Sequence, residues 1–95
     1  MKFTITFKDQ DLFTLAAHAD IGYWCRADST DRIVIEAETG KKFKITKASL
    51  KKAMEIMPKE APHAFAEIVT EGDGADSTIG DILVQLACFG KVVYG

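Results

Sequence analysis

The side chains of this sequence that could bind a transition metal or act as a nucleophile are few and widely spaced. They are His18, Cys25, His63 and Cys88. Zinc sites usually contain pairs of ligands separated by about two to four residues, and no such pair occurs among these four. The residues around both cysteines also lack the local motifs of cysteine-dependent enzymes. We therefore expect no metal site, no cofactor and no catalytic residue, and we expect that the protein is not an enzyme.

An acidic, glycine-rich stretch at residues 71–76 invites comparison with calcium-binding loops. Its acids, together with the next acid along the chain, are Glu71, Asp73, Asp76 and Asp81. An EF-hand loop requires acids at alternating positions, followed by a glycine and a closing glutamate, and this spacing is absent. Acids close to the start of a helix are stabilised by the helix dipole. We therefore interpret the stretch as the solvated start of a helix.

Lysines are concentrated in one part of the chain. Residues 41–59 contain seven lysines and one acid, whereas residues 60–81 contain six acids and neither lysine nor arginine. Such a basic segment could bind phosphates, because a strand would present some of the lysines and the start of a helix would add the others together with its backbone amides. The candidate anion-binding residues are Lys42, Lys44, Lys47, Lys51 and Lys52, within the segment from Lys41 to Lys52.

The same lysines have a second interpretation. Lysines protect an edge strand against pairing with another chain, and they keep an exposed helix soluble. The formal net charge is −2 and the pI is about 5.6, whereas a dedicated nucleic-acid-binding domain is usually strongly basic. Nucleic-acid or anion binding is therefore the alternative to a protein-binding function and not the leading hypothesis.

The 95 residues are expected to form one domain over 1–95. The composition, 47% hydrophobic and 27% charged, is ordinary for a globular chain, and a domain of this size buries enough surface to fold without a disulfide or a metal. No apolar run approaches the roughly 20 residues that cross a bilayer. The first residues, MKFTITF, lack the features of a signal peptide. We expect a cytoplasmic protein without membrane contact, with both cysteines as buried free thiols.

Residues 79–89 are expected to form the central helix of the fold. Apolar residues cover most of its circumference and leave Asp81 and Gln85 as a narrow polar edge, which is typical of a core helix. Residues 76–78 offer N-cap side chains, and Gly90 suits a left-handed C-cap. The side chains that we expect to be buried in this helix include Ile82, Leu83 and Leu86.

Shorter patterns predict the other elements. Residues 2–8 alternate between apolar and polar types like a half-buried strand, and Asp9 is the expected N-cap of the following helix. Pro58 is expected to end one helix and Pro62 to begin the next. The predicted elements are strands at 2–8, 23–27, 32–37 and 41–45, helices at about 10–19, 47–57, 62–70 and 79–89, and residues 92–94, which could add a short strand. The expected buried residues of the two middle helices are Leu50, Ala53, Met54 and Met57, and Phe65, Ile68 and Val69.

These elements predict an α+β fold. The sheet is expected to be small and mainly antiparallel, with three or four strands, and the order along the chain to be β-α-β-β-β-α-α-α with an optional last strand. Several helices and one small sheet pack best when all the helices cover one face of the sheet. The opposite face is then open.

The two strands that precede the helix at 47–57 are expected to form a hairpin with a three-residue loop, in which Gly40 is left-handed. In this register Ile35 faces Phe43, whereas a two-residue loop would place Ile35 opposite Lys44. Pairing of apolar residues favours the first register. It assigns Ile33, Ile35, Phe43 and Ile45 to the helix-covered face, and Val34, Glu36, Lys42 and Lys44 to the opposite face.

The open face of the sheet is the predicted interaction surface. Strand alternation at 23–27 places Trp24 and Arg26 together, opposite the face of Tyr23 and Cys25. Tryptophan and arginine are enriched at the energetic centres of protein interfaces. The predicted interface residues are Trp24, Arg26, Val34, Glu36, Lys42 and Lys44, and homodimerisation is the first use that we expect. The alternative is that Trp24 belongs to the core and that the strand phase is shifted by one residue.

Two short motifs, GYW at 22–24 and FGKVVYG at 89–95, resemble those of small bacteriophage and prophage proteins of uncharacterised function. The resemblance spans most of the chain and brings no catalytic residues with it. It implies an accessory protein of the host cytoplasm that binds and blocks or titrates a host component. The expected function is therefore non-enzymatic binding to a host or phage protein, as an inhibitor or modulator of a host process.

Overall fold

The computed structural model describes residues 9–28 and 31–95 and has an α+β fold. Its elements are α1 Asp9–Ala17, β1 Cys25–Asp28, β2 Ile33–Glu36, β3 Lys42–Lys44, α2 Lys47–Glu60, α3 Pro62–Glu71, a short 3₁₀ turn η1 Gly72–Gly74, and α4 Ser77–Phe89. The predicted fold class is therefore confirmed. The strand expected at residues 2–8 lies outside the described residues.

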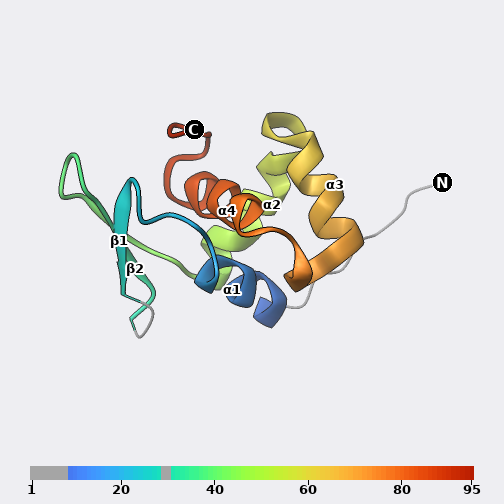
Figure 1. Cartoon of the computed structure of the whole chain (residues 1–95), viewed down its shortest axis with the longest axis horizontal. Coiled ribbons are helices and arrows are strands. Elements are labelled where there is room, and N and C mark those ends of the chain that lie inside the picture. The colour runs from blue at the N-terminus through green and yellow to red at the C-terminus, as the bar shows by residue number, and fades with distance from the viewer. Residues whose placement is uncertain (1–8, 29–30) are drawn as a thin grey trace.

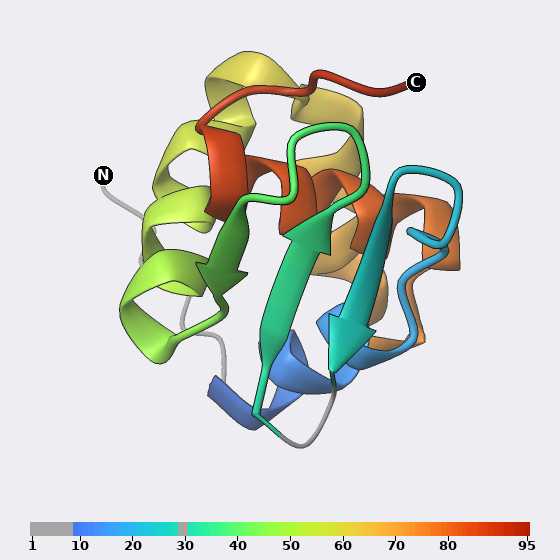
Figure 2. The same ribbon diagram turned by 90° about the vertical axis from the view of Figure 1, so that its left-hand side faces the viewer.

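The three strands form an antiparallel sheet in the order β1-β2-β3. The sheet stands at one end of the molecule, and the four α-helices lie on one side of it (Figure 1). Figure 2 looks onto the other face of the sheet, with α4 passing behind the strands. In the described part of the chain no helix covers this outer face, as the sequence predicted.

α4 is the central helix, and its ends are the predicted ones. The side chain of Asp76 accepts a hydrogen bond from a first-turn backbone N–H, and Gly90 forms a left-handed C-cap with φ of 75°. Leu83 and Leu86 are buried as predicted, but Ile82 is only half-buried. The prediction for Ile82 was wrong, because the buried side of α4 runs from Leu83 through Val84 and Gln85 to Leu86 and does not include Ile82.

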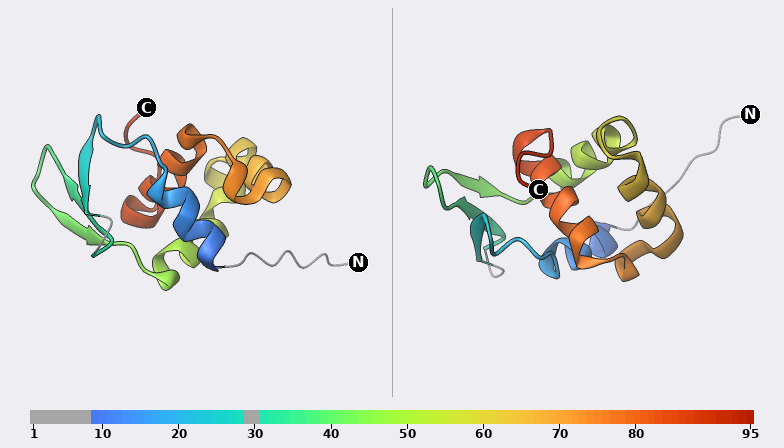
Figure 3. Two further views of the ribbon diagram at one scale, coloured as in Figure 1. Left: turned by 60° about the horizontal axis from the view of Figure 1, so that its bottom comes forward. Right: turned by 45° about the horizontal axis from the view of Figure 1, so that its top comes forward.

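α1 lies across α4 (Figure 3). The backbones of the two helices come close at Gly80. A Cβ atom at Gly80 would lie 2.8 Å from the carbonyl oxygen of Leu15 and 3.1 Å from the Cα atom of Ala19. Only glycine leaves room for so close a backbone approach. The contact fixes the separation of α1 from α4.

Pro58 does not end α2, contrary to the prediction. α2 continues to Glu60, and the N–H of Ala61 donates to the carbonyl of Met57 at 2.8 Å. A proline near the end of a helix removes one hydrogen bond only, and the remaining bonds carry the helix past it. Pro62 is the first residue of α3, as predicted.

Helical periodicity predicted the buried side of α2 correctly, but two of the three residues predicted to be buried in α3 are not. The predicted residues Leu50, Ala53, Met54 and Met57 of α2 are all buried. In α3 the buried residues are Ala64 and Ile68, whereas Phe65 is half-buried and Val69 is 42% exposed. The buried side of α3 therefore includes the predicted Ile68 but is turned toward Ala64 and away from Phe65 and Val69.

The β2–β3 hairpin has a four-residue loop at 37–40 instead of the predicted three-residue loop. Gly40 is left-handed as predicted, with φ of 73°, and its N–H donates to the carbonyl of Glu36 at 2.8 Å. Val34 lies opposite Phe43, whereas the predicted register placed the next residue there. A one-residue shift exchanges the two faces of a strand. The face toward the helices therefore carries Val34, Glu36 and Phe43, and the outer face carries Ile33, Ile35, Lys42 and Lys44.

β1 begins at Cys25 and not at Tyr23 as predicted. Residues 22–24 form a turn in which the N–H groups of Trp24 and Cys25 both donate to the carbonyl of Ile21, at 3.1 and 3.2 Å. The turn interrupts the alternation of a strand. Two consecutive residues, Trp24 and Cys25, are consequently both buried.

Candidate functional site

Three of the six residues predicted to form the interface lie inside the protein. The exposed fractions are 2% for Trp24, 3% for Val34 and 8% for Glu36. The register shift turns Val34 and Glu36 toward the helices, and the turn at 22–24 turns Trp24 inward. The prediction that Trp24 is exposed was wrong, and the alternative that it belongs to the core is the correct one.

Trp24 packs against two aromatic side chains, that of Phe89 at the end of α4 and that of Tyr94 in the segment after α4. Its ring stacks on that of Tyr94, with centroids 5.2 Å apart and planes at 10°, and the ring of Phe89 lies 5.4 Å away. The indole Nε1–H donates to Oδ1 of Asp81 at 2.8 Å. A buried tryptophan that stacks on one aromatic ring, contacts a second and has its N–H paired serves packing.

Asp81 is the centre of a buried hydrogen-bond cluster on the polar edge of α4. Its carboxylate accepts from the indole of Trp24, from Nε2 of Gln85 at 3.0 Å and from the hydroxyl of Tyr23 at 2.5 Å. In the described part of the chain, no buried polar side-chain atom lacks a hydrogen-bond partner. The cluster therefore stabilises the fold and leaves no unpaired buried group for chemistry.

Gln85 binds the segment that follows α4. Its Oε1 accepts from the backbone N–H groups of Val93 and Tyr94, both at 2.8 Å, and its Nε2 donates to the carbonyl of Tyr94 at 2.9 Å. These are the bonds that a neighbouring strand would otherwise make. Residues 92–94 consequently form no strand, and a side chain of α4 holds them in place.

Glu36 connects the hairpin loop to the same segment. Its carboxylate accepts from the hydroxyl of Thr39 at 2.6 Å and from the hydroxyl of Tyr94. These two hydrogen bonds lower the pKa of Glu36, and the bond to Glu36 raises the pKa of Tyr94. Glu36 is thus part of the internal structure and not of an interface.

The outer face of the sheet, which we define as Arg26, Ile33, Ile35, Lys42 and Lys44, is the candidate site (Figure 2). Strand pairing places Ile35 between Arg26 and Lys42, and Ile33 beside Lys44. The three basic residues are exposed. Both isoleucines are half-buried without packing against the core. The outer face therefore has an apolar centre with a basic rim.

Sequence reasoning found the basic part of this site and missed the apolar part. Arg26, Lys42 and Lys44 were predicted on the open face and lie there. Ile33 and Ile35 were assigned to the core. No local pattern separates them from Val34, because all three are β-branched and apolar. The polar residue that could have set the phase, Glu36, is itself buried.

The five predicted anion-binding lysines divide between β3 and the exposed side of α2. They are Lys42 and Lys44, and Lys47, Lys51 and Lys52, all exposed. At the start of α2, the hydroxyl of Thr46 accepts from the N–H of Ser49 at 3.0 Å, so one free amide of this helix end is already used. Phe43, the aromatic residue of β3, packs against the core and Phe89. Phe43 therefore offers Lys42 and Lys44 no exposed ring on which a base could stack.

Neither cysteine has the environment of a reactive thiol. Both are free; Cys25 is buried and Cys88 is half-buried. Burial raises the pKa of Cys25 to about 11 and that of Cys88 to about 12. A thiol with so high a pKa is protonated at neutral pH and is a poor nucleophile. The described residues also contain no cluster of three side chains suited to a metal ion.

Alkaline pH is expected to destabilise the protein. The pKa values of Cys25, Cys88 and Tyr23 are raised in the fold from 9.0, 9.0 and 10.0 to about 11, 12 and 12, chiefly by burial. Each group ionises first in the unfolded chain, so its contribution to stability is complete below its unfolded pKa and is lost as pH rises through the folded one. The denaturant midpoint should be constant just below pH 9 and fall between about pH 9 and 12. Cys88→Ala should flatten this fall, and an equal fall in the variant would contradict the assignment.

Comparison of the chain with protein-family models, curated proteins and solved structures finds no match. None of the helices within residues 9–28 and 31–95 has the length and hydropathy needed to cross a membrane.

Proposed function

We propose that this protein is a non-enzymatic binding module that attaches to a protein partner through the outer face of its sheet. The observation that supports the proposal is the pairing of Ile33 and Ile35 with basic residues on a face that no helix covers. An apolar centre with a polar rim is the usual anatomy of a protein interface, and arginine is enriched at its energetic centres.

The partner that fits this face has an acidic surface with an apolar centre. Arg26, Lys42 and Lys44 give the face three positive charges. Complementary charge steers association and selects the partner. A host or phage protein of this kind agrees with the resemblance to phage accessory proteins in the host cytoplasm.

A homodimer through the same face is the weaker form of the proposal. A two-fold interface brings the same patch of both subunits together. The basic residues of the outer face would then face the basic residues of its copy, and like charges at an interface oppose binding. We therefore favour a different, acidic partner. Light scattering that gives the mass of a dimer, lost on substitution of Ile35, would favour self-association instead.

Nucleic-acid binding is the second candidate function. Its support is the continuous run of exposed lysines from β3 into α2. Single-stranded nucleic acids bind best where bases stack on aromatic residues, and Phe43, which lies between Lys42 and Lys44 in β3, packs inward. Only phosphate contacts remain, and they weaken steeply with salt.

Affinity capture with matched variants tests the proposal. The parent and Val69→Asp, a control at an exposed apolar position of α3, should retain the same proteins from a nuclease-treated host extract. Ile35→Asp should reduce the retained amount at least about tenfold, because an acid in the apolar centre removes burial and repels an acidic partner. Equal retention by Ile35→Asp and the parent would contradict the proposal.

Charge reversal separates the two candidate functions. Lys42→Glu with Lys44→Glu should abolish protein capture, whereas Lys51→Glu with Lys52→Glu should leave it unchanged. If the protein binds nucleic acid, both double variants should weaken retention of labelled DNA or RNA at low salt, since each removes phosphate contacts. Loss of protein capture in the α2 variant would move the interface away from the sheet.

A further inference from the structure

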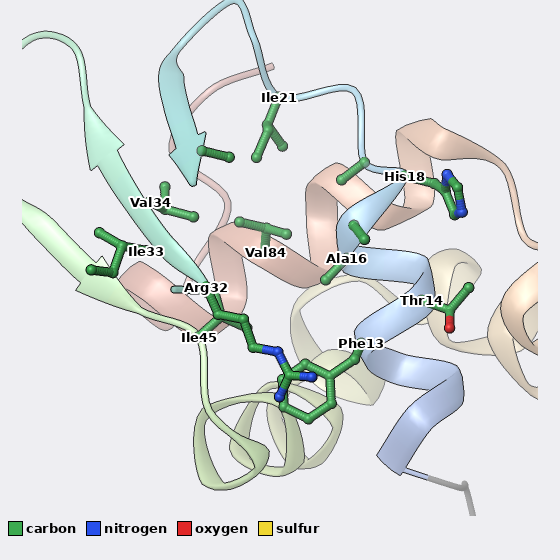
Figure 4. Close-up of a pocket in the computed structure, with 13 residues that line it drawn as sticks. Phe13, Thr14, Ala16, His18, Ile21, Arg32, Ile33, Val34, Ile45 and Val84 are labelled. Carbon is green, nitrogen blue, oxygen red and sulfur yellow. The ribbon is translucent and has the colours of Figure 1, made fainter. Parts of the chain in front are cut away.

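A cavity of about 320 Å³ lies between α1 and the inner face of the sheet (Figure 4). Its wall is apolar and is formed by α1, the segment before β1, the strands and α4. The side chains that line it include Phe13, Ala16, Ile21, Val34, Ile45 and Val84. Small-molecule sites in proteins are concave, mostly apolar cavities that begin at about this size and carry a few polar groups.

Arg32 supplies the polar group of this cavity. Its guanidinium lies over the ring of Phe13, with the central carbon 3.7 Å from the ring centroid. Thr14 and His18 also border the cavity, but their side chains point away from its centre (Figure 4). A guanidinium that stacks by its face presents N–H donors at its edge, where they match the two oxygens of a carboxylate.

The backbone at Arg32 is strained in a way that places this side chain. Its φ is +55°, the left-handed region that non-glycine residues adopt at a cost in free energy. The carbonyl of Arg32 accepts a hydrogen bond from the N–H of Ile45 at 2.7 Å, which holds the strained turn against β3. Strain of this kind occurs preferentially at ligand sites.

We infer that the cavity binds a small carboxylate with an apolar body. The apolar part fills the space between α1 and the sheet, and the carboxylate pairs with the guanidinium of Arg32. At roughly 30 Å³ for each non-hydrogen atom, the share of one molecule in liquid water, the cavity holds about ten such atoms. A medium-chain fatty acid such as octanoate has this size and this chemistry. Ile33 of the outer face also borders this cavity, whereas Arg26, Ile35, Lys42 and Lys44 are not among its lining residues.

Titration calorimetry of the full chain with octanoate and with 1-octanol tests the charge part of the inference. Octanoate should bind with one-to-one stoichiometry and about two- to fivefold more tightly than octanol, because octanol cannot form the charged pair and Arg32 is exposed to solvent. Arg32→Met should remove this difference, whereas Arg26→Met, which deletes an arginine of the outer face, should leave it intact. Equal binding of both probes by the parent, or unchanged octanoate binding in Arg32→Met, would overturn the role of Arg32.

Two further variants test the location. Ala16→Leu places a larger side chain in the cavity and should abolish binding of both probes while the denaturant midpoint stays equal or rises. Arg32→Gly removes the backbone strain at this position, because glycine adopts a positive φ freely, so the variant should fold. It should nevertheless lose the preference for octanoate over octanol. Octanoate binding that persists in Ala16→Leu, or no binding to the parent at millimolar concentration, would overturn the inference.

Discussion

Replacement of Leu83 by alanine is expected to lower the free energy of unfolding by about 2–5 kcal/mol. Leu83 is 0% exposed in α4, which contacts each of the other three α-helices. The substitution removes buried methyl groups and leaves a cavity that the surrounding helices cannot fill without moving. Denaturant unfolding followed by circular dichroism measures the loss.

Ile82→Ala is the matched control for this substitution. Ile82 is the preceding residue of the same helix and loses a similar volume, but it is only half-buried. The expected loss is at most about half of that for Leu83, since the free energy follows the apolar area removed from water. Equal losses at both positions would show that the buried side of α4 is assigned wrongly.

Replacement of Gln85 by leucine is expected to cost about 2–4 kcal/mol and to release the segment that follows α4. The leucine keeps the volume of the side chain but cannot replace the hydrogen bonds that Gln85 makes to Val93, Tyr94 and Asp81. Buried polar groups without partners are costly, so the segment should detach from α4 and regain its hydrogen bonds from water. Tyr94 would then leave the ring of Trp24.

The fluorescence of Trp24 and the denaturant midpoint together measure this effect. In Gln85→Leu the midpoint should fall and the emission should shift to longer wavelength, because Tyr94 no longer covers the indole. Tyr94→Phe is the control: it keeps the stacked ring and removes only the hydroxyl that donates to Glu36. The control should retain the parent emission. A Gln85→Leu protein with the stability and emission of the parent would contradict the role of Gln85.

The sequence predicted the helical part of the fold well because its determinants are local. The spacing of Leu50, Ala53, Met54 and Met57 defines the buried side of α2 without reference to any other element. The N-cap of α4 was predictable as well, because the carboxylate of Asp76 accepts a hydrogen bond from the nearby backbone N–H of Thr78. Local patterns of this kind depend on few residues and survive packing.

The hairpin register could not be predicted because contacts far apart in sequence determine it. A carboxylate such as that of Glu36 is expected to face water. Here it faces inward, since Tyr94, 58 residues later, and Thr39 donate hydrogen bonds to it. Pairing of apolar residues then favours the wrong loop length, and a shift of one residue exchanges the two faces of β2.

The position of Trp24 has a similar cause. Its indole N–H is paired with Asp81, which stands 57 residues later in the sequence, and its ring stacks on Tyr94. These partners lie inside, and the turn before β1 directs the indole toward them. The basic residues of the outer face were nevertheless placed correctly, because strand alternation within β1 and β3 alone determines where Arg26, Lys42 and Lys44 point.

The emission of Trp24 in the parent protein tests the arrangement of the sheet most directly, because the chain contains one tryptophan. The turn before β1 directs Trp24 into the core, where its ring stacks on Tyr94, so the outer face of the sheet does not include it. We expect a blue-shifted emission that iodide does not quench. Emission near that of tryptophan in water, with full quenching by iodide, would place Trp24 at the surface and contradict both this turn and the set of residues assigned to the outer face.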